Sequence, residues 1–147
     1  MPRLLALACL LALSGCATLT GSATPTSAAL RDIGGRWSGS ASQWNSGDTT
    51  GPVDSQWSVE LTIRSGPEGS SGLVGTVSYP SLGCSGRLTY IGPGAGSSHM
   101  FREDIDVGAD RCIPTGMVTL ERGEDVVLYS AQHDGSTSVS MGVLTTE

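Results

Sequence analysis

Two histidines, His99 and His133, are the residues of this 147-residue chain best suited to acid–base chemistry. Both stand beside glycine-rich or Asp-Gly turn sequences, so we expect them to be solvated loop residues. The nearest approach to a Gly-x-Ser-x-Gly nucleophile motif is GCSGR at residues 83–87, where the spacing is wrong and no helix follows. Lysine is absent, which excludes lysine nucleophiles and Schiff bases. We therefore expect that the protein is not an enzyme.

The acidic run at residues 103–110 has carboxylates at spacings similar to those of a calcium-binding loop. However, Ile105 and Val107 occupy the intervening positions, as in a strand with an acidic outer face, and no bidentate glutamate follows at the end of the loop. The glycine-rich run at residues 92–96 is followed by neither a lysine nor a helix, so it is a turn and not a phosphate cradle. We expect neither a metal ion nor another cofactor.

Glu103 is the one charged residue whose expected position is unusual. If Phe101, Ile105 and Val107 face the interior of a sheet, the period of two turns Glu103 inward with them. A buried carboxylate has to be paired or protonated, because burying it alone is costly. The alternative is that this face of the strand is assigned wrongly and Glu103 points outward.

Arginine is the expected partner of an inward Glu103. Arg87 and Arg111 both lie near the cysteines discussed below, and either one could form the ion pair. A second hypothesis is that Glu103 contacts a bound ligand.

Aromatic residues bear on the same question of ligand binding. The chain has only seven Trp, Tyr and Phe residues: Trp37, Trp44, Trp57, Tyr79, Tyr90, Phe101 and Tyr129. Trp44 lies in the polar stretch 43–56, outside any alternation, so it is a candidate contact for a protein partner, with packing across the end of the sheet as the alternative. Trp37, Trp44, Glu103 and Arg87 form the set of candidate ligand or partner contacts.

The cysteines predict one disulfide. Cys9 and Cys16 belong to the N-terminal segment described below, which leaves Cys84 and Cys112. An even pair in an exported protein favours a structural bridge, which contributes about 3–4 kcal/mol by the chain-entropy model. Redox and metal-binding pairs more often have Cys-x-x-Cys spacing, which this pair lacks.

The elements that position these residues are strands, because the hydrophobic period is two. In residues 57–64 every apolar residue is followed by a polar one. Weaker alternation predicts further strands at residues 35–42, 73–79, 87–91, 100–107, 117–122, 126–131 and 138–144. No amphipathic helix is expected among them.

The connections between these strands contain turn residues, at residues 65–69, 92–96, 122–125 and 133–135. Most connections are too short for a parallel crossover, so sequential strands should be antiparallel neighbours. The sequence therefore predicts an all-β fold of about eight antiparallel strands. An up-and-down β-barrel leaves no exposed edge, and a two-sheet β-sandwich is the alternative.

The N-terminal segment has the three parts of an export signal: a basic residue at Arg3, an apolar stretch at residues 4–13, and small residues at the cleavage point. The apolar stretch is shorter than the roughly 20 residues that a membrane-spanning helix needs. Leu13-Ser14-Gly15-Cys16 resembles the lipobox of bacterial lipoproteins at every position. The resemblance implies removal of the signal peptide, residues 1–15, and attachment of a diacylglycerol to Cys16, with palmitate among the acyl chains. A cleaved signal followed by a chance cysteine is the alternative.

Residues 16–29, which follow the cleavage point, are small and polar apart from one leucine, and we expect a flexible tether. Residues 30–147 are enough for one domain with a single core. The processed chain would carry a net charge of −7, from seven arginines and fourteen acidic residues, without an arginine cluster. Nucleic acid is therefore not an expected partner.

Gly35-Arg36-Trp37 opens the first predicted strand as Gly-x-Trp, which resembles lipocalin-like and avidin-like (calycin-like) barrels, where the tryptophan plugs one end. We expect a non-catalytic binding or interaction module in the bacterial cell envelope. Its lipid anchor would hold it at the periplasmic face of an outer membrane or, in a single-membraned host, at the outer face of the cytoplasmic membrane. The alternatives are an inhibitor of an envelope-directed lysozyme or protease, and a carrier of a small apolar ligand bound among Trp37, Leu61 and Phe101.

Overall fold

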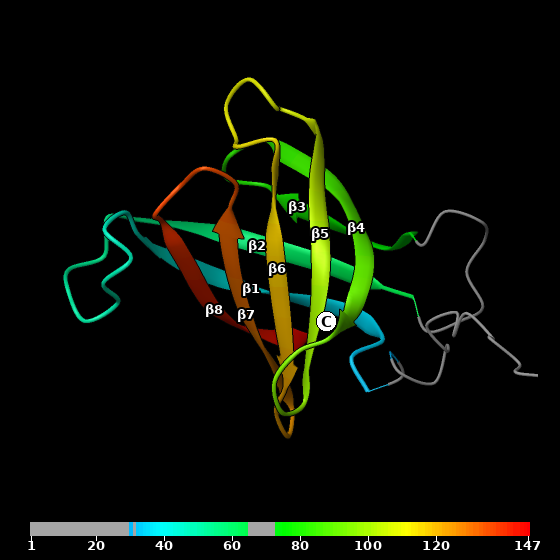
Figure 1. Ribbon diagram of the computed structural model, residues 1–147. Coiled ribbons are helices and arrows are strands. Elements are labelled where there is room, and N and C mark those ends of the chain that lie inside the picture. Colours follow the sequence, from blue (N-terminus) through cyan, green and yellow to red (C-terminus); the bar gives the residue numbers. More distant parts are fainter. Residues whose placement is uncertain (1–29, 31, 65–72) are drawn as a thin grey trace, which may run out of the picture.

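A computed structural model of the protein describes residues 30, 32–64 and 73–147. Eight antiparallel strands close into a barrel (Figure 1). The strands are β1 (Gly35–Trp44), β2 (Ser55–Ile63), β3 (Leu73–Tyr79), β4 (Cys84–Pro93), β5 (Ser98–Val107), β6 (Thr115–Arg122), β7 (Val126–His133) and β8 (Val139–Thr146). The predicted all-β class is confirmed. The lipobox and the residues of the tether lie outside the described part of the chain.

Each strand pairs with the next one in the sequence, and β1 pairs with β8 to close the barrel. Because every strand has a neighbour on both sides, the sheet has no open edge. The up-and-down barrel is therefore confirmed, and the sandwich alternative is wrong. Within the described ranges, the chain contains no helix with the length and apolarity needed to cross a bilayer.

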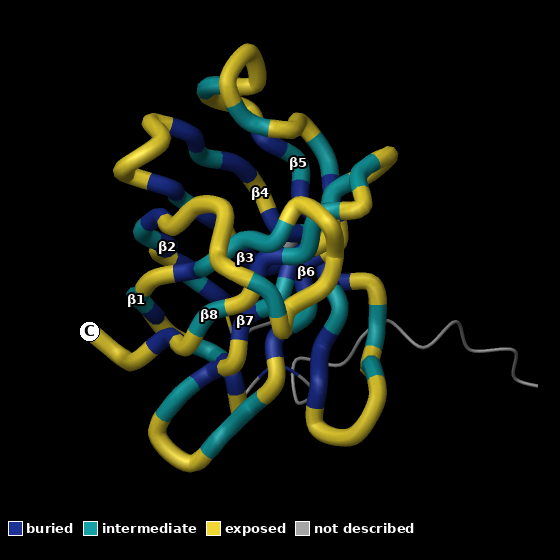
Figure 2. Tube along the Cα trace, turned by 90° about the vertical axis from the view of Figure 1, so that its left-hand side faces the viewer, coloured by how far each residue is buried: buried dark blue, intermediate teal, exposed yellow. Residues whose placement is uncertain are grey.

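Alternating side chains fill the interior, as buried and exposed positions follow one another along the strands (Figure 2). On β2 the side chains of Trp57, Val59, Leu61 and Ile63 all point into the core. Full burial of an aliphatic side chain of this kind contributes about 1.5–3 kcal/mol. The period of two seen in the sequence thus sets the register of the barrel.

Several strands are longer than the alternation predicted. β4 begins at Cys84 and β7 continues to His133, although the predictions were residues 87–91 and 126–131. Small and polar residues at these ends hide the hydrophobic alternation, while backbone pairing continues, for example between His133 and Gly116. The added residues matter because they reach the rim of the barrel.

The position expected for Val107 is wrong. Its side chain is 57% exposed. The register of β4 against β5 shifts between Ser85 and Gly86, opposite the end of β5, and this irregularity interrupts the inward series after Ile105.

The two ends of the barrel differ. At the closed end, the N-terminal approach to β1 lies across the interior: Ile33 is fully buried, and its carbonyl accepts a hydrogen bond from Trp37 Nε1 at 2.9 Å. The guanidinium of Arg122 lies 5.1 Å from the centre of the Trp37 ring, within cation–π range. At the open end lie the connections 45–54, 80–83, 108–114 and 134–138.

Candidate ligand site at the open end of the barrel

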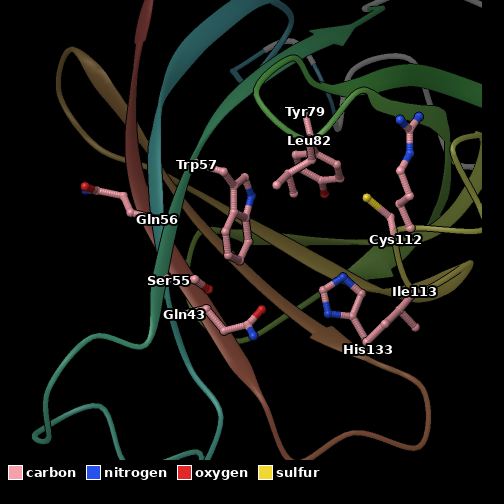
Figure 3. A pocket seen from close by; sticks show the side chains of 10 residues that line it. Gln43, Ser55, Gln56, Trp57, Tyr79, Leu82, Cys112, Ile113 and His133 are labelled. Atoms are coloured by element: carbon pink, nitrogen blue, oxygen red, sulfur yellow. The ribbon is translucent and has the colours of Figure 1, made fainter.

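A cavity of about 270 Å³ opens among the connections of the open end (Figure 3). It is bounded by the ends of β1, β2, β3 and β7 and by two of the connections. Its lining residues are Gln43, Ser55, Gln56, Trp57, Tyr79, Leu82, Arg111, Cys112, Ile113 and His133. Its volume is just below the range of about 300–1,000 Å³ that is typical of small-molecule sites.

Glu103 lies in the barrel interior, as the period of two predicted, and it is fully buried. The Tyr79 hydroxyl donates a hydrogen bond to Glu103 Oε1, and the hydroxyls of Tyr79 and Tyr129 are 2.9 Å apart. Burial raises the pKa of the Glu103 carboxyl, and the hydrogen bond from Tyr79 opposes part of that rise. A buried polar chain therefore runs from a wall of the cavity, at Tyr79, into the core.

The predicted arginine partners of Glu103 are wrong. Arg87 points outward and binds Asp106 with two hydrogen bonds, of 2.8 and 2.9 Å. Arg111 donates instead to the carbonyl of Gly83 at 2.9 Å. The reason is the same alternation that turns Glu103 inward: Arg87 stands between the buried Gly86 and Leu88, so its side chain must face solvent.

His133 takes the place expected for an arginine. Its Nε2 lies 3.7 Å from Glu103 Oε2, and its side chain is only 12% exposed. Burial lowers the pKa of the His133 imidazole, more than the nearby Asp134 raises it, so the neutral ring is favoured. The solvated position expected for His133 is therefore wrong. The alternation of Tyr129 and Ala131, continued by two residues, would have placed His133 inward.

His99 is also misplaced by the sequence prediction. It lies within β5, is buried, and places its Nε2 3.1 Å from Asp32 Oδ2 near the closed end. Both histidines therefore belong to strands and not to turns, His99 near the closed end and His133 at the open end, because β5 and β7 are longer than the alternation indicated.

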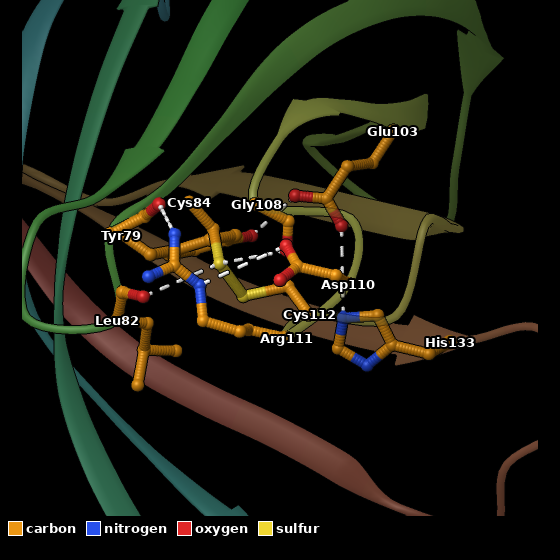
Figure 4. The surroundings of a disulfide bond; sticks show 10 residues. Tyr79, Leu82, Cys84, Glu103, Gly108, Asp110, Arg111, Cys112 and His133 are labelled. Carbon is orange, nitrogen blue, oxygen red and sulfur yellow. Dashed lines mark hydrogen bonds and ion pairs between the residues drawn. A yellow bond between two sulfur atoms is a disulfide. The ribbon is translucent and has the colours of Figure 1, made fainter.

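The predicted disulfide between Cys84 and Cys112 is confirmed, with an S–S distance of 2.06 Å (Figure 4). It joins the start of β4 to the connection between β5 and β6, beside the cavity. Gly108 fits closely against this bridge with a φ of 75°, and an added Cβ would lie 2.9 Å from Cys84 Sγ. The Gly108 carbonyl accepts hydrogen bonds from the amides of Arg111 and Cys112, so the loop is held at several points.

Three buried side-chain atoms around this site have no hydrogen-bond partner in the described part of the chain: Trp57 Nε1, Glu103 Oε2 and His133 Nδ1. In Figure 3 the Trp57 nitrogen lies on the side of the indole toward Tyr79 and Leu82, away from Gln56. By contrast, Trp37 Nε1 and Trp44 Nε1 donate to backbone carbonyls at 2.9 and 3.0 Å. The only other such atom in the described residues is His99 Nδ1, near the closed end. Unpaired buried polar groups are uncommon, and three of these four lie around the cavity.

The other candidate contacts lie elsewhere. Trp37 is at the closed end, and Arg87 is on the outer surface. Trp44 ends β1, half-buried, and its indole donates to Gly51 within its own loop. Trp37, Leu61 and Phe101, the expected lining of an apolar carrier site, do not line the open-end cavity.

Among residues 30, 32–64 and 73–147, no group of three or more His, Cys, Asp or Glu side chains could hold a metal ion. Comparison of the chain with protein-family models, curated proteins and solved structures gives no match.

Proposed function

We propose that this protein is a lipid-anchored lipoprotein of the bacterial cell envelope, and that its barrel is a non-catalytic module that binds a small ligand at the open end. The lipobox at residues 13–16 supports the anchor. The cavity with unpaired polar atoms around it carries the binding proposal. Binding sites of this kind combine apolar walls with a few directed polar groups, and the open end offers both.

The position of the site suits this role. The N-terminal approach to β1, from which the tether would extend, is at the closed end, and the cavity faces the opposite way. A chain anchored through Cys16 would thus present its open end away from the anchor point. The disulfide fixes one side of the rim, which reduces the ordering that binding has to impose.

Two measurements test this proposal. Both use the full chain, expressed in a bacterium with the protein's own signal peptide. In the first, wild-type protein fractionates with membranes and gains the mass of its acyl chains, whereas Cys16→Ser does neither. In the second, native mass spectrometry after mild detergent extraction detects a small molecule that denaturation releases. A soluble, unmodified wild-type chain would refute the anchor, and a protein that is bare and binds no small molecule would refute the ligand site.

An inhibitor of an envelope-directed hydrolase is the second candidate, because the open end also exposes apolar side chains. Val53, Leu82 and Ile113 lie on three different connections there, each with 40% or more of its surface exposed. Exposed apolar residues around a rim favour contact with a protein. Inhibition of lysozyme by the extracted protein, lost in a Leu82→Ser, Ile113→Ser double variant, would support this function over the small-ligand module.

A further inference from the structure

The indole of Trp57 shows what the ligand at the open end must offer. Indole nitrogen is a donor only, and a buried donor without an acceptor costs about 1–3 kcal/mol. Trp57 is 9% exposed, and its N–H faces the lining of the cavity with no acceptor in reach. A ligand in this cavity therefore gains from an oxygen or nitrogen that accepts from Trp57.

His133 adds the opposite requirement. His133 lines the same cavity, its neutral ring carries one N–H and one lone pair, and its buried Nδ1 has no partner. The imidazole can donate from Nδ1 or accept there, depending on which nitrogen holds the proton. A ligand group that both donates and accepts satisfies His133 in either tautomer, as well as the donor on Trp57.

The charges around the cavity narrow the class of ligand further. The polar groups on the wall, Trp57 and the neutral His133, carry no charge, and the guanidinium of Arg111 already lies 3.9 Å from Asp110 and donates to the Gly83 carbonyl, so little offsets the cost of removing an anion from water. A cation would face the guanidinium of Arg111 on the wall and could accept nothing from Trp57. Leu82, Ile113 and the Cys112 bridge supply apolar surface for the rest of the ligand.

We propose that the open-end cavity binds a small neutral molecule that has an apolar body and a hydroxyl or carboxamide group hydrogen-bonded to Trp57. This inference rests on the proposed binding function and specifies its ligand class. It differs from an apolar carrier, because the polar group and not the hydrocarbon alone determines affinity.

A series of probes with one ring and different polar groups tests the class. The full chain in mild detergent is labelled with ¹⁵N at its tryptophan indoles and titrated with cyclohexanol, cyclohexanecarboxamide, cyclohexanecarboxylate, cyclohexylammonium and cyclohexane. We expect the alcohol and the carboxamide to move the Trp57 indole N–H resonance downfield, as a hydrogen bond forms. The Trp37 resonance should stay in place, because its N–H is already bonded at the closed end.

Trp57→Phe should weaken cyclohexanol binding by about fivefold, which corresponds to one neutral hydrogen bond of about 1 kcal/mol. Tyr90→Phe, near the closed end, is the matched control and should retain the wild-type affinity. Because Phe keeps most of the apolar volume, the Trp57 variant should still fold, and its backbone NMR spectrum checks this.

The outcomes separate the ligand class from the function. Tighter binding of the carboxylate or the ammonium, or equal binding of cyclohexane, would overturn the neutral polar class while leaving the binding site in place. Failure of all five probes would overturn the class as well. If the extracted protein then still carries a small molecule in native mass spectrometry, the binding function stands, and if it is bare, both proposals fall.

Discussion

Two inward-facing tryptophans on neighbouring strands, Trp37 on β1 and Trp57 on β2, distinguish the ends of this barrel. At the closed end, the Trp37 N–H bonds the Ile33 carbonyl, and Arg122 covers the ring. At the open end, the Trp57 N–H is buried with no partner. The same residue type is satisfied by the fold in one place and left unsatisfied in the other.

The difference between the two tryptophans indicates that the closed end serves stability and the open end serves binding. At the closed end, Trp37 Nε1 has its hydrogen bond supplied from within the chain and only His99 Nδ1 is left unpaired among the described residues, so the value of this end lies in stability. Groups around the cavity carry unmet hydrogen-bonding capacity, which lowers stability and is of use only if something else supplies the partner. Residues of the closed end should therefore affect folding, and residues of the open end should affect binding.

The disulfide is the exception, because it stabilises the open end, and its loss has the largest expected effect. Replacing Cys84 and Cys112 by serine in the full chain should lower the free energy of unfolding by about 3.5 kcal/mol, since the bridge joins residues 28 positions apart. Urea denaturation measures this change. Reductant should destabilise the wild type and leave the double variant unaffected, and a loss below about 1 kcal/mol would contradict the prediction.

Phenylalanine substitutions compare the two tryptophans directly. Trp37→Phe leaves the buried Ile33 carbonyl unpaired and weakens the contact with Arg122, so it should cost about 1–2 kcal/mol more than Trp57→Phe. Each variant loses the same volume of ring. Equal midpoints in urea would show that the two ends do not differ in the way proposed.

The pH dependence of stability tests the buried carboxyl at the open end. Because burial raises the pKa of folded Glu103 above its ordinary value of 4.5, the folded chain keeps a proton that the unfolded chain releases. The free energy of unfolding should therefore fall as the pH rises from about 4.5 through the raised pKa. Glu103→Gln should remove this fall, and Glu60→Gln, on the outer face of β2, should retain it.

His133 should give the opposite slope. Its pKa in the folded protein is lowered from 6.5, so the unfolded chain takes up a proton first as the pH falls. Stability should therefore decrease as the pH drops from 6.5 through the lowered pKa, and His133→Gln should abolish that decrease. Thermal melting at a series of pH values measures both slopes, and an unchanged profile in the variant would refute the assignment.

The alternation in the sequence was sufficient for the architecture, because a side-chain period of two and short connections leave few ways to join the strands. It also placed Glu103 inside. The disulfide followed from the count of cysteines outside the signal. These features depend on local pattern, which the sequence displays directly.

The candidate site was harder to predict, because it depends on contacts between distant strands. His133 meets Glu103 across a separation of 30 positions, and nothing local marks the pair. The cavity arises from how side chains from several strands and connections pack at the open end of the barrel. No local pattern in the sequence indicates that packing. The expected arginines failed because proximity in sequence to the cysteines did not mean that they shared a face.

Loss of an exposed ion pair has the smallest expected effect on stability. One such pair at each end of the barrel allows the two ends to be compared. Arg36 pairs with Glu147 at the closed end at 3.5 Å, and Arg102 pairs with Asp134 at the open end at 2.7 Å. All four side chains are at least 40% exposed, so replacing either arginine by glutamine should change the free energy of unfolding by less than about 1 kcal/mol.

The two substitutions should still differ in their effect on His133. Asp134 raises the pKa of His133, and Arg102 offsets part of that negative charge. Arg102→Gln should therefore move the NMR titration of the His133 ring to higher pH, whereas Arg36→Gln should leave it in place. A shift in both variants would mean that the imidazole senses the net charge of the chain and not the carboxylates of the open end.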